Sequence, residues 1–157
     1  MRRSTGGENH IHHILENGKP IKETRYLTDA LTTKAIDFVN GKAESGNKKK
    51  KPFFLYMSYN APHVPLEAPQ EYIDKFPELA DRYPSVSVGW GKYLRTCDNP
   101  GQVYAAMMVN LDDNIGRFME NLKEQGLDDN TLVFFLSDNG APRNVMPFAS
   151  NKPFRGV

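Results

Sequence analysis

The chain has 157 residues, about the size of one ordinary domain. Apolar residues make up 39% and charged residues 25%, which is typical of a soluble globular protein. The formal net charge of +1 gives no electrostatic argument for nucleic acid or an anionic membrane as the main partner. No apolar run approaches the roughly 18 residues that span a bilayer, and no signal peptide is evident. The single cysteine, Cys97, excludes an internal disulfide.

Residues 1–25 are polar and without a clear hydrophobic period, so we expect a loop or a partly ordered arm there. A helix is predicted over residues 28–40, because apolar residues recur at helical spacing from Leu27 to Val39. Thr28 is a plausible N-cap, and Gly41 is the expected stop.

A second, longer helix is the clearest element of the sequence. Asn99 can cap it, and Pro100 occupies the favoured first position. Gly126 is the expected C′ residue, and Leu127 packs back on the helix. One continuous apolar face runs along it, formed by Val103, Tyr104, Met107, Met108, Leu111, Ile115, Phe118, Met119 and Leu122.

Short apolar runs at residues 53–57 and 131–136 predict two strands buried on both faces, as in a parallel sheet. Short helices are expected over residues 69–80 and irregular structure over residues 82–100. The alternation of helices and strands predicts an α/β fold with a mostly parallel sheet and flanking helices.

Polar side chains follow both predicted strands, where α/β proteins gather their ligands. Asn60 and His63 follow the first strand, and Asp138 and Asn139 follow the second. A carboxylate and an amide oxygen suit a hard cation such as Ca²⁺, although Asp-Asn-Gly is equally good turn chemistry. His63 lies in a proline-stiffened segment and could bind an anion or donate a proton, or be an ordinary loop histidine.

Two further clusters carry weaker interpretations. A transition-metal site is possible at three N-terminal histidines, but no cysteine or carboxylate stands at a recognised ligand spacing beside His10, His12 and His13. A solvated helix face is the expected role of Asp112, Asp113 and Asn114.

Motifs across residues 25–157 resemble the sulfatase family in content and order. They are Tyr26-Leu27-Thr28-Asp29-Ala30-Leu31, Lys51-Pro52-Phe53-Phe54-Leu55-Tyr56-Met57, Asn60-Ala61-Pro62-His63-Val64-Pro65-Leu66, Tyr104-Ala105-Ala106-Met107, Asp112-Asp113-Asn114-Ile115-Gly116, Gly126-Leu127-Asp128-Asp129-Asn130-Thr131-Leu132, Ser137-Asp138-Asn139-Gly140 and Asn151-Lys152-Pro153-Phe154-Arg155-Gly156. Each motif alone is weak, whereas their shared order is specific. Residues 26–157 thus resemble the central part of a sulfatase catalytic domain, truncated at both ends.

The resemblance implies an alkaline-phosphatase-like α/β fold and hydrolysis of sulfate esters, either aryl sulfates or sulfated glycans. It implies that Asp138 and Asn139 are Ca²⁺ ligands. It also implies that His63 contacts the substrate sulfate and assists the leaving group. A dianionic transition state is stabilised by a metal ion and positioned donors, so the chemistry is consistent. The family's compartments are periplasmic, secreted or lysosomal.

The sequence departs from the family at the nucleophile. Sulfatases use a formylglycine made within Cys/Ser-x-Pro/Ala-x-Arg, and neither Cys97 nor any serine here stands in that pattern. A first Asp pair and a catalytic lysine also have no counterpart. We therefore expect the isolated chain to be inactive. Two alternatives remain: a related phosphatase or phosphonate hydrolase with a Thr or Ser nucleophile and two metal sites, and a non-catalytic remnant or binding module.

Overall fold

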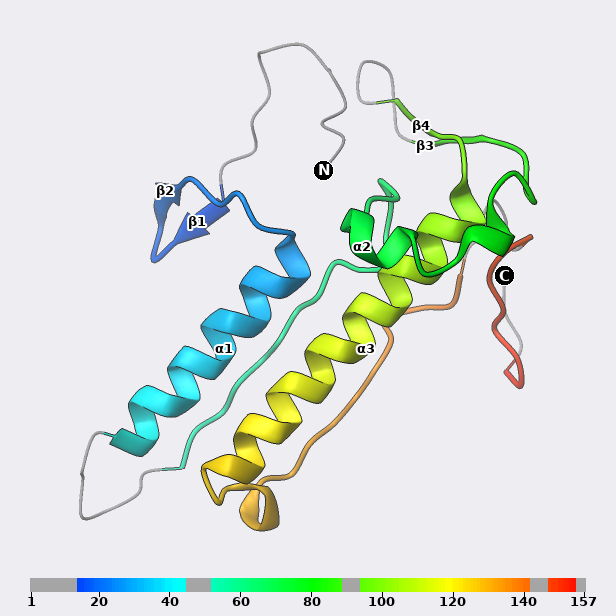
Figure 1. Ribbon diagram of the computed structural model, residues 1–157. Coiled ribbons are helices and arrows are strands. Elements are labelled where there is room, and N and C mark those ends of the chain that lie inside the picture. Colours follow the sequence, from blue (N-terminus) through cyan, green and yellow to red (C-terminus); the bar gives the residue numbers. More distant parts are fainter. Residues whose placement is uncertain (1–13, 45–51, 89–93, 142–146, 155–157) are drawn as a thin grey trace.

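The computed structural model describes residues 14–44, 52–88, 94–141 and 147–154 (Figure 1). In chain order its elements are β1 (Ile14–Glu16), β2 (Lys19–Ile21), α1 (Leu27–Glu44), α2 (Gln70–Ile73), the 3₁₀ turn η1 (Pro77–Leu79), β3 (Val86–Val88), β4 (Arg95–Cys97), α3 (Pro100–Glu124) and the 3₁₀ turn η3 (Asp128–Asn130). Among the described residues, no helix is both long and apolar enough to cross a membrane.

Helix α1 confirms the predicted helix but differs at both ends. It begins at Leu27, one residue before the expected N-cap, and the Thr28 side chain is buried. The predicted stop at Gly41 is wrong, because the helix continues to Glu44. A glycine inside a helix costs only about 1 kcal/mol relative to alanine, so it does not end a helix by itself.

Helix α3 ends as predicted. Gly126 adopts a positive φ of 62°, and its N–H donates to the Lys123 carbonyl at 2.9 Å. The Leu127 N–H donates to the Leu122 carbonyl at 2.9 Å, which completes a Schellman motif. At the other end Asn99 makes no side-chain cap. Its Oδ1 instead accepts the Asp81 N–H at 3.0 Å and so ties the preceding loop to the helix.

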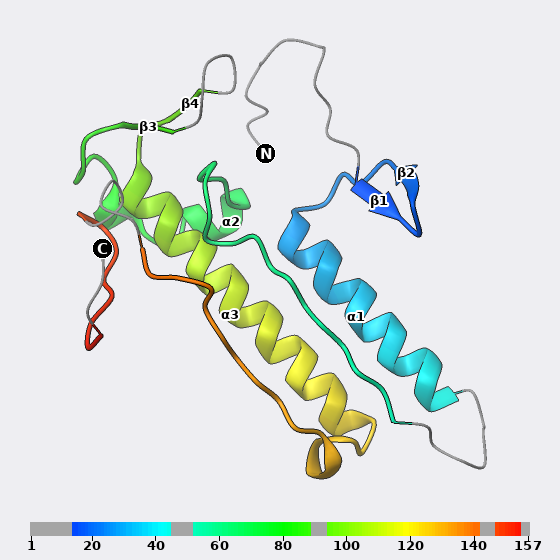
Figure 2. The same ribbon diagram turned by 180° about the vertical axis from the view of Figure 1, so that it is seen from behind.

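Helices α1 and α3 lie side by side and run in the same direction (Figures 1 and 2). The Asn110 amide donates to the Asp29 carboxylate at 3.0 Å, and the Asn121 amide donates to the Asn40 side-chain oxygen at 3.0 Å. Both pairs are separated by 81 residues in the sequence. An equal offset at two points along two helices requires parallel axes in a fixed register.

The described sheets are two separate antiparallel hairpins, β1–β2 and β3–β4. The first hairpin lies within residues 1–25, where a loop or a partly ordered arm was predicted. Asn17 and Gly18 both adopt positive φ in its turn. Such a two-residue turn matches the twist of antiparallel strands. The β3–β4 hairpin likewise lies within residues predicted to be irregular. The boundary between residues 25 and 26 stays a prediction.

The two predicted buried strands are extended segments without a hydrogen-bonded ladder in the described chain. Each follows a long helix and runs back along it, so residues 52–59 and 131–137 point the same way (Figures 1 and 2). Their parallel sense agrees with an α/β architecture. The predicted parallel sheet is absent from the part of the chain that the structure describes, because neither segment has a strand beside it to complete a ladder.

Burial along these segments differs from the prediction of two buried faces. In the first, side chains alternate: the Phe53 ring meets the Phe38 ring of α1 edge-on at 5.9 Å, whereas Phe54 is 88% exposed. In the second, the apolar side chains are exposed; they are Leu132, Val133, Phe134, Phe135 and Leu136. One face of the first segment and both faces of the second therefore lack a cover in the described chain.

We predict that these exposed apolar side chains make the chain self-associate as its concentration rises, because open apolar strands pair with one another. Phe134, which is 75% exposed, lies at the centre of the second segment. Phe134→Lys should weaken association at least about tenfold, measured by sedimentation velocity. Leu15→Lys, an equal change of charge at an exposed position of β1, is the control. Equal effects of the two variants would contradict the prediction.

Candidate functional site

His63 lies in a loop that follows the first extended segment. Its backbone N–H donates to the Asn60 carbonyl at 2.8 Å, which closes a turn. Its side chain is exposed between Pro62 and Pro65, both in cis peptide bonds. Leu66 then enters the core and packs on α3. The histidine therefore lies at the protein surface, whereas Leu66 at the end of the loop is buried.

The imidazole orientation of His63 is defined by one contact. Its Nδ1 lies 2.6 Å from the Val64 carbonyl oxygen. Because a carbonyl can only accept, Nδ1 carries the proton in this arrangement. In the neutral ring Nε2 is then the unprotonated nitrogen, and in the cationic ring it is a second donor. Nε2 is thus the atom left to meet a ligand.

A pocket of about 270 Å³ lies beside His63, between the start of α1 and the loop. Its wall includes Tyr26 and Thr28 from the helix start, Glu67 from the loop and Met107 from α3. Burial raises the pKa of Tyr26, so its hydroxyl stays protonated and able to donate at neutral pH. The first turn of α1 borders the pocket with the positive end of the helix dipole.

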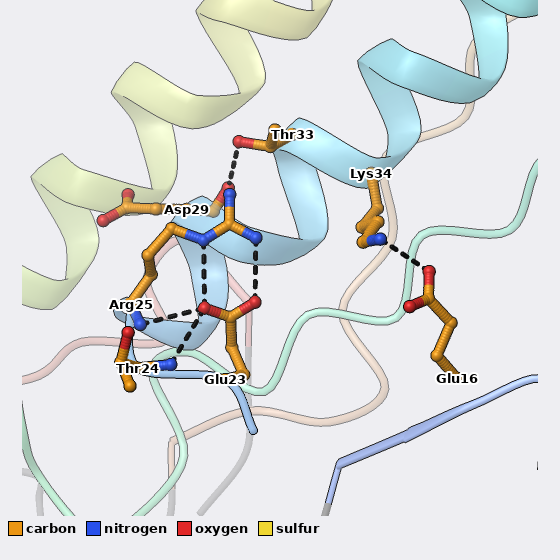
Figure 3. A network of polar contacts seen from close by, with 7 residues as sticks. All are labelled: Glu16, Glu23, Thr24, Arg25, Asp29, Thr33 and Lys34. Carbon is orange, nitrogen blue, oxygen red and sulfur yellow. Dashed lines mark hydrogen bonds and ion pairs between the residues drawn. The ribbon is translucent and has the colours of Figure 1, made fainter. Parts of the chain in front are cut away.

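A tight turn fixes the chain before α1 (Figure 3). The Glu23 carboxylate accepts the backbone N–H of Thr24 at 3.0 Å and that of Arg25 at 2.9 Å. It also accepts both Nε and Nη2 of Arg25. The Arg25 guanidinium lowers the pKa of Glu23 to about 2, so the turn keeps its charge pair at neutral pH.

Asp138 and Asn139 are exposed at the end of the second extended segment. Asp138 Oδ1 accepts the Asn139 backbone N–H at 2.9 Å. The Asn139 amide nitrogen donates to the Gly140 carbonyl at 3.2 Å. These bonds are the turn chemistry that Asp-Asn-Gly favours, and they use one carboxylate oxygen. The second carboxylate oxygen and the Asn139 amide oxygen have no protein partner in the described chain.

The residues present fit a hard cation only in part. Two exposed oxygens of the preferred type stand on adjacent residues, whereas Ca²⁺ takes about six to eight oxygen ligands. The described residues contain no cluster of three or more His, Cys, Asp or Glu side chains able to hold a metal. No hydrogen bond or ion pair in that part of the chain joins His63 to Asp138 or Asn139. His10, His12 and His13 lie outside the described residues.

Gly140 brings the Ser-Asp-Asn-Gly motif against Asn151. A Cβ on Gly140 would lie 2.9 Å from the Asn151 side chain, so only glycine leaves room for it. Asn151 Oδ1 accepts the Ala141 N–H at 2.7 Å, and its amide donates back to the Ala141 carbonyl at 3.2 Å. Two motifs ten residues apart therefore support one another beside Asp138 and Asn139.

The sequence interpretation missed a polar network on α3. Asn114 was expected on a solvated face, yet it is 1% exposed. Its amide donates to Asp29 at 2.7 Å, and its oxygen accepts from Arg117 at 2.8 Å. Asp112 is exposed as predicted. The carboxylate of exposed Asp113 accepts from the Tyr72 hydroxyl at 2.8 Å. A polar residue paired across two helices has no periodic pattern that would reveal it.

Comparison with known proteins decides the family. A family model described as Sulfatase matches residues 1–156. The chain belongs to the sulfatase family. Among curated relatives, the sulfatase YdeN of Escherichia coli, itself uncharacterized, is 33% identical over 82% of this chain and 19% of its own length. The arylsulfatase of Klebsiella aerogenes is 33% identical over 59% of this chain and 26% of its own length.

Solved structures agree with the family assignment. The crystal structure of Ps i-CgsB matches 96% of this sulfatase chain at 36% identity, with a TM-score of 0.71, and 29% of its own chain is covered. Ps i-CgsB in complex with k-i-k-neocarrahexaose matches 87% at 38% identity, with a TM-score of 0.67 and 25% of its own chain covered. The present sulfatase chain thus spans less than a third of each of these proteins.

We predict that Gly140→Ala breaks the contact between the two motifs, because the new methyl group displaces the Asn151 side chain. Loss of a hydrogen bond worth about 1 kcal/mol should speed exchange of the Ala141 amide proton about fivefold. Gly116→Ala is the control, since a Cβ there meets nothing within 4 Å. Amide hydrogen exchange followed by NMR measures both. Unchanged Ala141 exchange in Gly140→Ala would show that the contact is not needed.

Proposed function

We propose that this chain supplies part of the active site of a sulfuric ester hydrolase that acts on sulfated glycans. In this proposal His63 contacts the substrate sulfate, and Asp138 and Asn139 contribute ligands to a hard cation, Ca²⁺. Family membership supports sulfuric ester hydrolysis for the family as a whole. The assignment to this chain's residues is carried by one observation: His63 is exposed and held in its loop, and its Nε2 has no hydrogen-bond partner among the described residues.

The His63 environment suits an anion. With Nδ1 engaged by the Val64 carbonyl, Nε2 of the protonated ring is a charged donor, which makes a stronger hydrogen bond to a sulfate oxygen than a neutral donor. The adjacent pocket, at about 270 Å³, borders the first turn of α1. The helix dipole there also favours negative charge. His63 can donate to the bridging oxygen as the ester bond breaks and so assist the leaving group.

Asp138 and Asn139 suit the second role through their donor types. Their two unpartnered oxygens are carboxylate and amide oxygens, as Ca²⁺ prefers. A cation bound there would supply positive charge against the sulfate oxygens. The Gly140–Asn151 contact holds the turn that carries both ligands. The remaining ligands would come from elsewhere in a complete active site.

The substrate class rests on one comparison. Ps i-CgsB was solved with k-i-k-neocarrahexaose, and it matches this chain over 87% of its length at 38% identity. A glycan could also be met by two side chains on the pocket wall, where Tyr26 offers a hydroxyl group and Glu67 a carboxylate. Such groups hydrogen-bond sugar hydroxyls. We therefore propose a sulfated glycan rather than a small aryl sulfate.

We predict that the 157-residue chain alone does not hydrolyse p-nitrophenyl sulfate or a sulfated oligosaccharide, even with Ca²⁺. Its Cys97 and serines all lie outside the pattern Cys/Ser-x-Pro/Ala-x-Arg, so no nucleophile of the family's type is present. Release of p-nitrophenol and of inorganic sulfate measures this. Turnover that is abolished by His63→Ala would overturn the prediction and reveal an unexpected nucleophile.

We predict weak Ca²⁺ binding at Asp138, with a dissociation constant of about 1 mM or above, because a site with few ligands binds poorly. Asp138→Asn should weaken it at least about tenfold, since it removes the one carboxylate. Asp128→Asn, the same change on the exposed turn η3, is the matched control. NMR titration with CaCl₂ measures both variants. Equal loss in the two would point to diffuse electrostatic attraction instead.

A further inference from the structure

A buried hydroxyl on α1 holds the extended segment that leads to His63. Thr32 is 0% exposed, and its Oγ1 lies 2.9 Å from the Thr28 carbonyl oxygen. The same Oγ1 lies 2.7 Å from the Tyr59 hydroxyl. Thr32 has one hydroxyl proton, and the Thr28 carbonyl can only accept it. Thr32 therefore accepts the proton of Tyr59, and the bond from segment to helix has a defined direction.

Tyr59 is the last residue before the loop that carries His63. The next residue, Asn60, accepts the His63 N–H at 2.8 Å, so the anchor and the histidine are separated by a single turn. Beyond the histidine, Leu66 is 7% exposed and packs in one cluster with Met107 of α3. The loop is thus fixed to α1 at its start and to α3 at its end.

These two anchors are independent of the catalytic chemistry. Burial raises the pKa of Tyr59, so its hydroxyl remains a donor at neutral pH. Thr32 is too deeply buried to meet a substrate, and the walls of the pocket beside His63 do not include Tyr59. A role in catalysis for this pair can only act through His63.

We propose that Thr32 and Tyr59 are a positioning pair for His63: their hydrogen bond holds the loop so that Nδ1 donates to the Val64 carbonyl and Nε2 faces the ligand. The consequence for sulfate binding rests on the function proposed above. The positioning itself does not, because it concerns the tautomer of His63 in the free chain.

The same segment offers a matched control. Tyr56 lies three residues before Tyr59, and it is 79% exposed. Tyr59→Phe and Tyr56→Phe each remove one hydroxyl from an aromatic ring in the same extended segment. Only the first removes the bond to α1. Tyr56→Phe thus reports the effect of removing a tyrosine hydroxyl from this segment where the side chain is exposed.

The experiment measures the His63 tautomer by long-range ¹H–¹⁵N NMR on the full 157-residue chain, with resonances assigned from His63→Asn. In the wild type, neutral His63 should be protonated at Nδ1. Tyr59→Phe should reduce the ratio of Nδ1–H to Nε2–H about fivefold. This is the factor expected if release of the loop breaks the hydrogen bond from Nδ1 to the Val64 carbonyl. Tyr56→Phe should leave it unchanged. Equal ratios in both variants, or no Nδ1–H excess in the wild type, would overturn the proposal.

A second pair of variants tests the proposal in case the Tyr59→Phe chain does not fold. Thr32→Val keeps the shape and removes the acceptor, whereas Thr32→Ser retains it. The tautomer ratio should fall in the first and be preserved in the second. A fall in both, with the fold intact by circular dichroism, would indicate a packing effect and overturn the proposal.

Titration with sodium sulfate separates this proposal from the proposed function. If the tautomer ratio responds as expected and sulfate shifts the His63 resonances more weakly in Tyr59→Phe, both hold. If the ratio responds and sulfate has no effect on wild-type His63, the positioning pair stands and the sulfate role fails. If sulfate binds alike in every variant while the ratio is constant, the positioning pair fails and the sulfate role stands.

Discussion

The rest of the structure depends on the hydrogen bonds between Asp29 and two asparagines of α3. Asn110 and Asn114 both donate to one carboxylate oxygen of Asp29, at 3.0 and 2.7 Å. Asp29 lies in the first turn of α1, where the helix dipole also stabilises its charge. A partly buried carboxylate is costly without such donors and favourable with them. The junction therefore fixes α1 and α3 in one register, and the loop of His63 is attached to both helices.

The register of α1 and α3 sets the direction of the extended segments but does not make them into strands. Parallel helices force the segments that return along them to run in the same direction, so the polar residues after each segment lie toward the starts of the helices (Figure 2). A strand, however, exists only through hydrogen bonds to a neighbouring strand. Phe54 and Leu132 remain 88% and 80% exposed because nothing in the described chain lies over them. The two extended segments therefore run in the same direction, as strands of a parallel sheet do, although they form no sheet in the described chain.

The sequence predicted what depends on local chemistry and missed what depends on distant partners. The end of α3 at Gly126 was predicted, since a positive φ favours glycine and the Schellman bonds are local. The burial of Asn114 was missed, because its reason is a carboxylate 85 residues away. The strands at residues 53–57 and 131–136 were predicted from apolar content, which indicates a tendency to pair but not whether a neighbouring strand is present. His63, Asp138 and Asn139 came from strand ends and family resemblance together, and their roles stay predictions.

The two halves of the candidate site differ in how firmly the chain holds them. Before His63 in the chain, Tyr59 is hydrogen-bonded to Thr32 of α1, and after it Leu66 is buried against α3. The His63 Nδ1 itself contacts the Val64 carbonyl oxygen. Asp138 and Asn139 are exposed, and apart from the Gly140 contact with Asn151 their bonds are local. A group that binds an anion through one nitrogen needs its direction fixed in advance, since a misdirected donor contributes little. Cation ligands of flexible geometry can instead be ordered by the ion they bind. The chain thus holds His63 more firmly than Asp138 and Asn139, which is consistent with the anion and cation roles proposed for them.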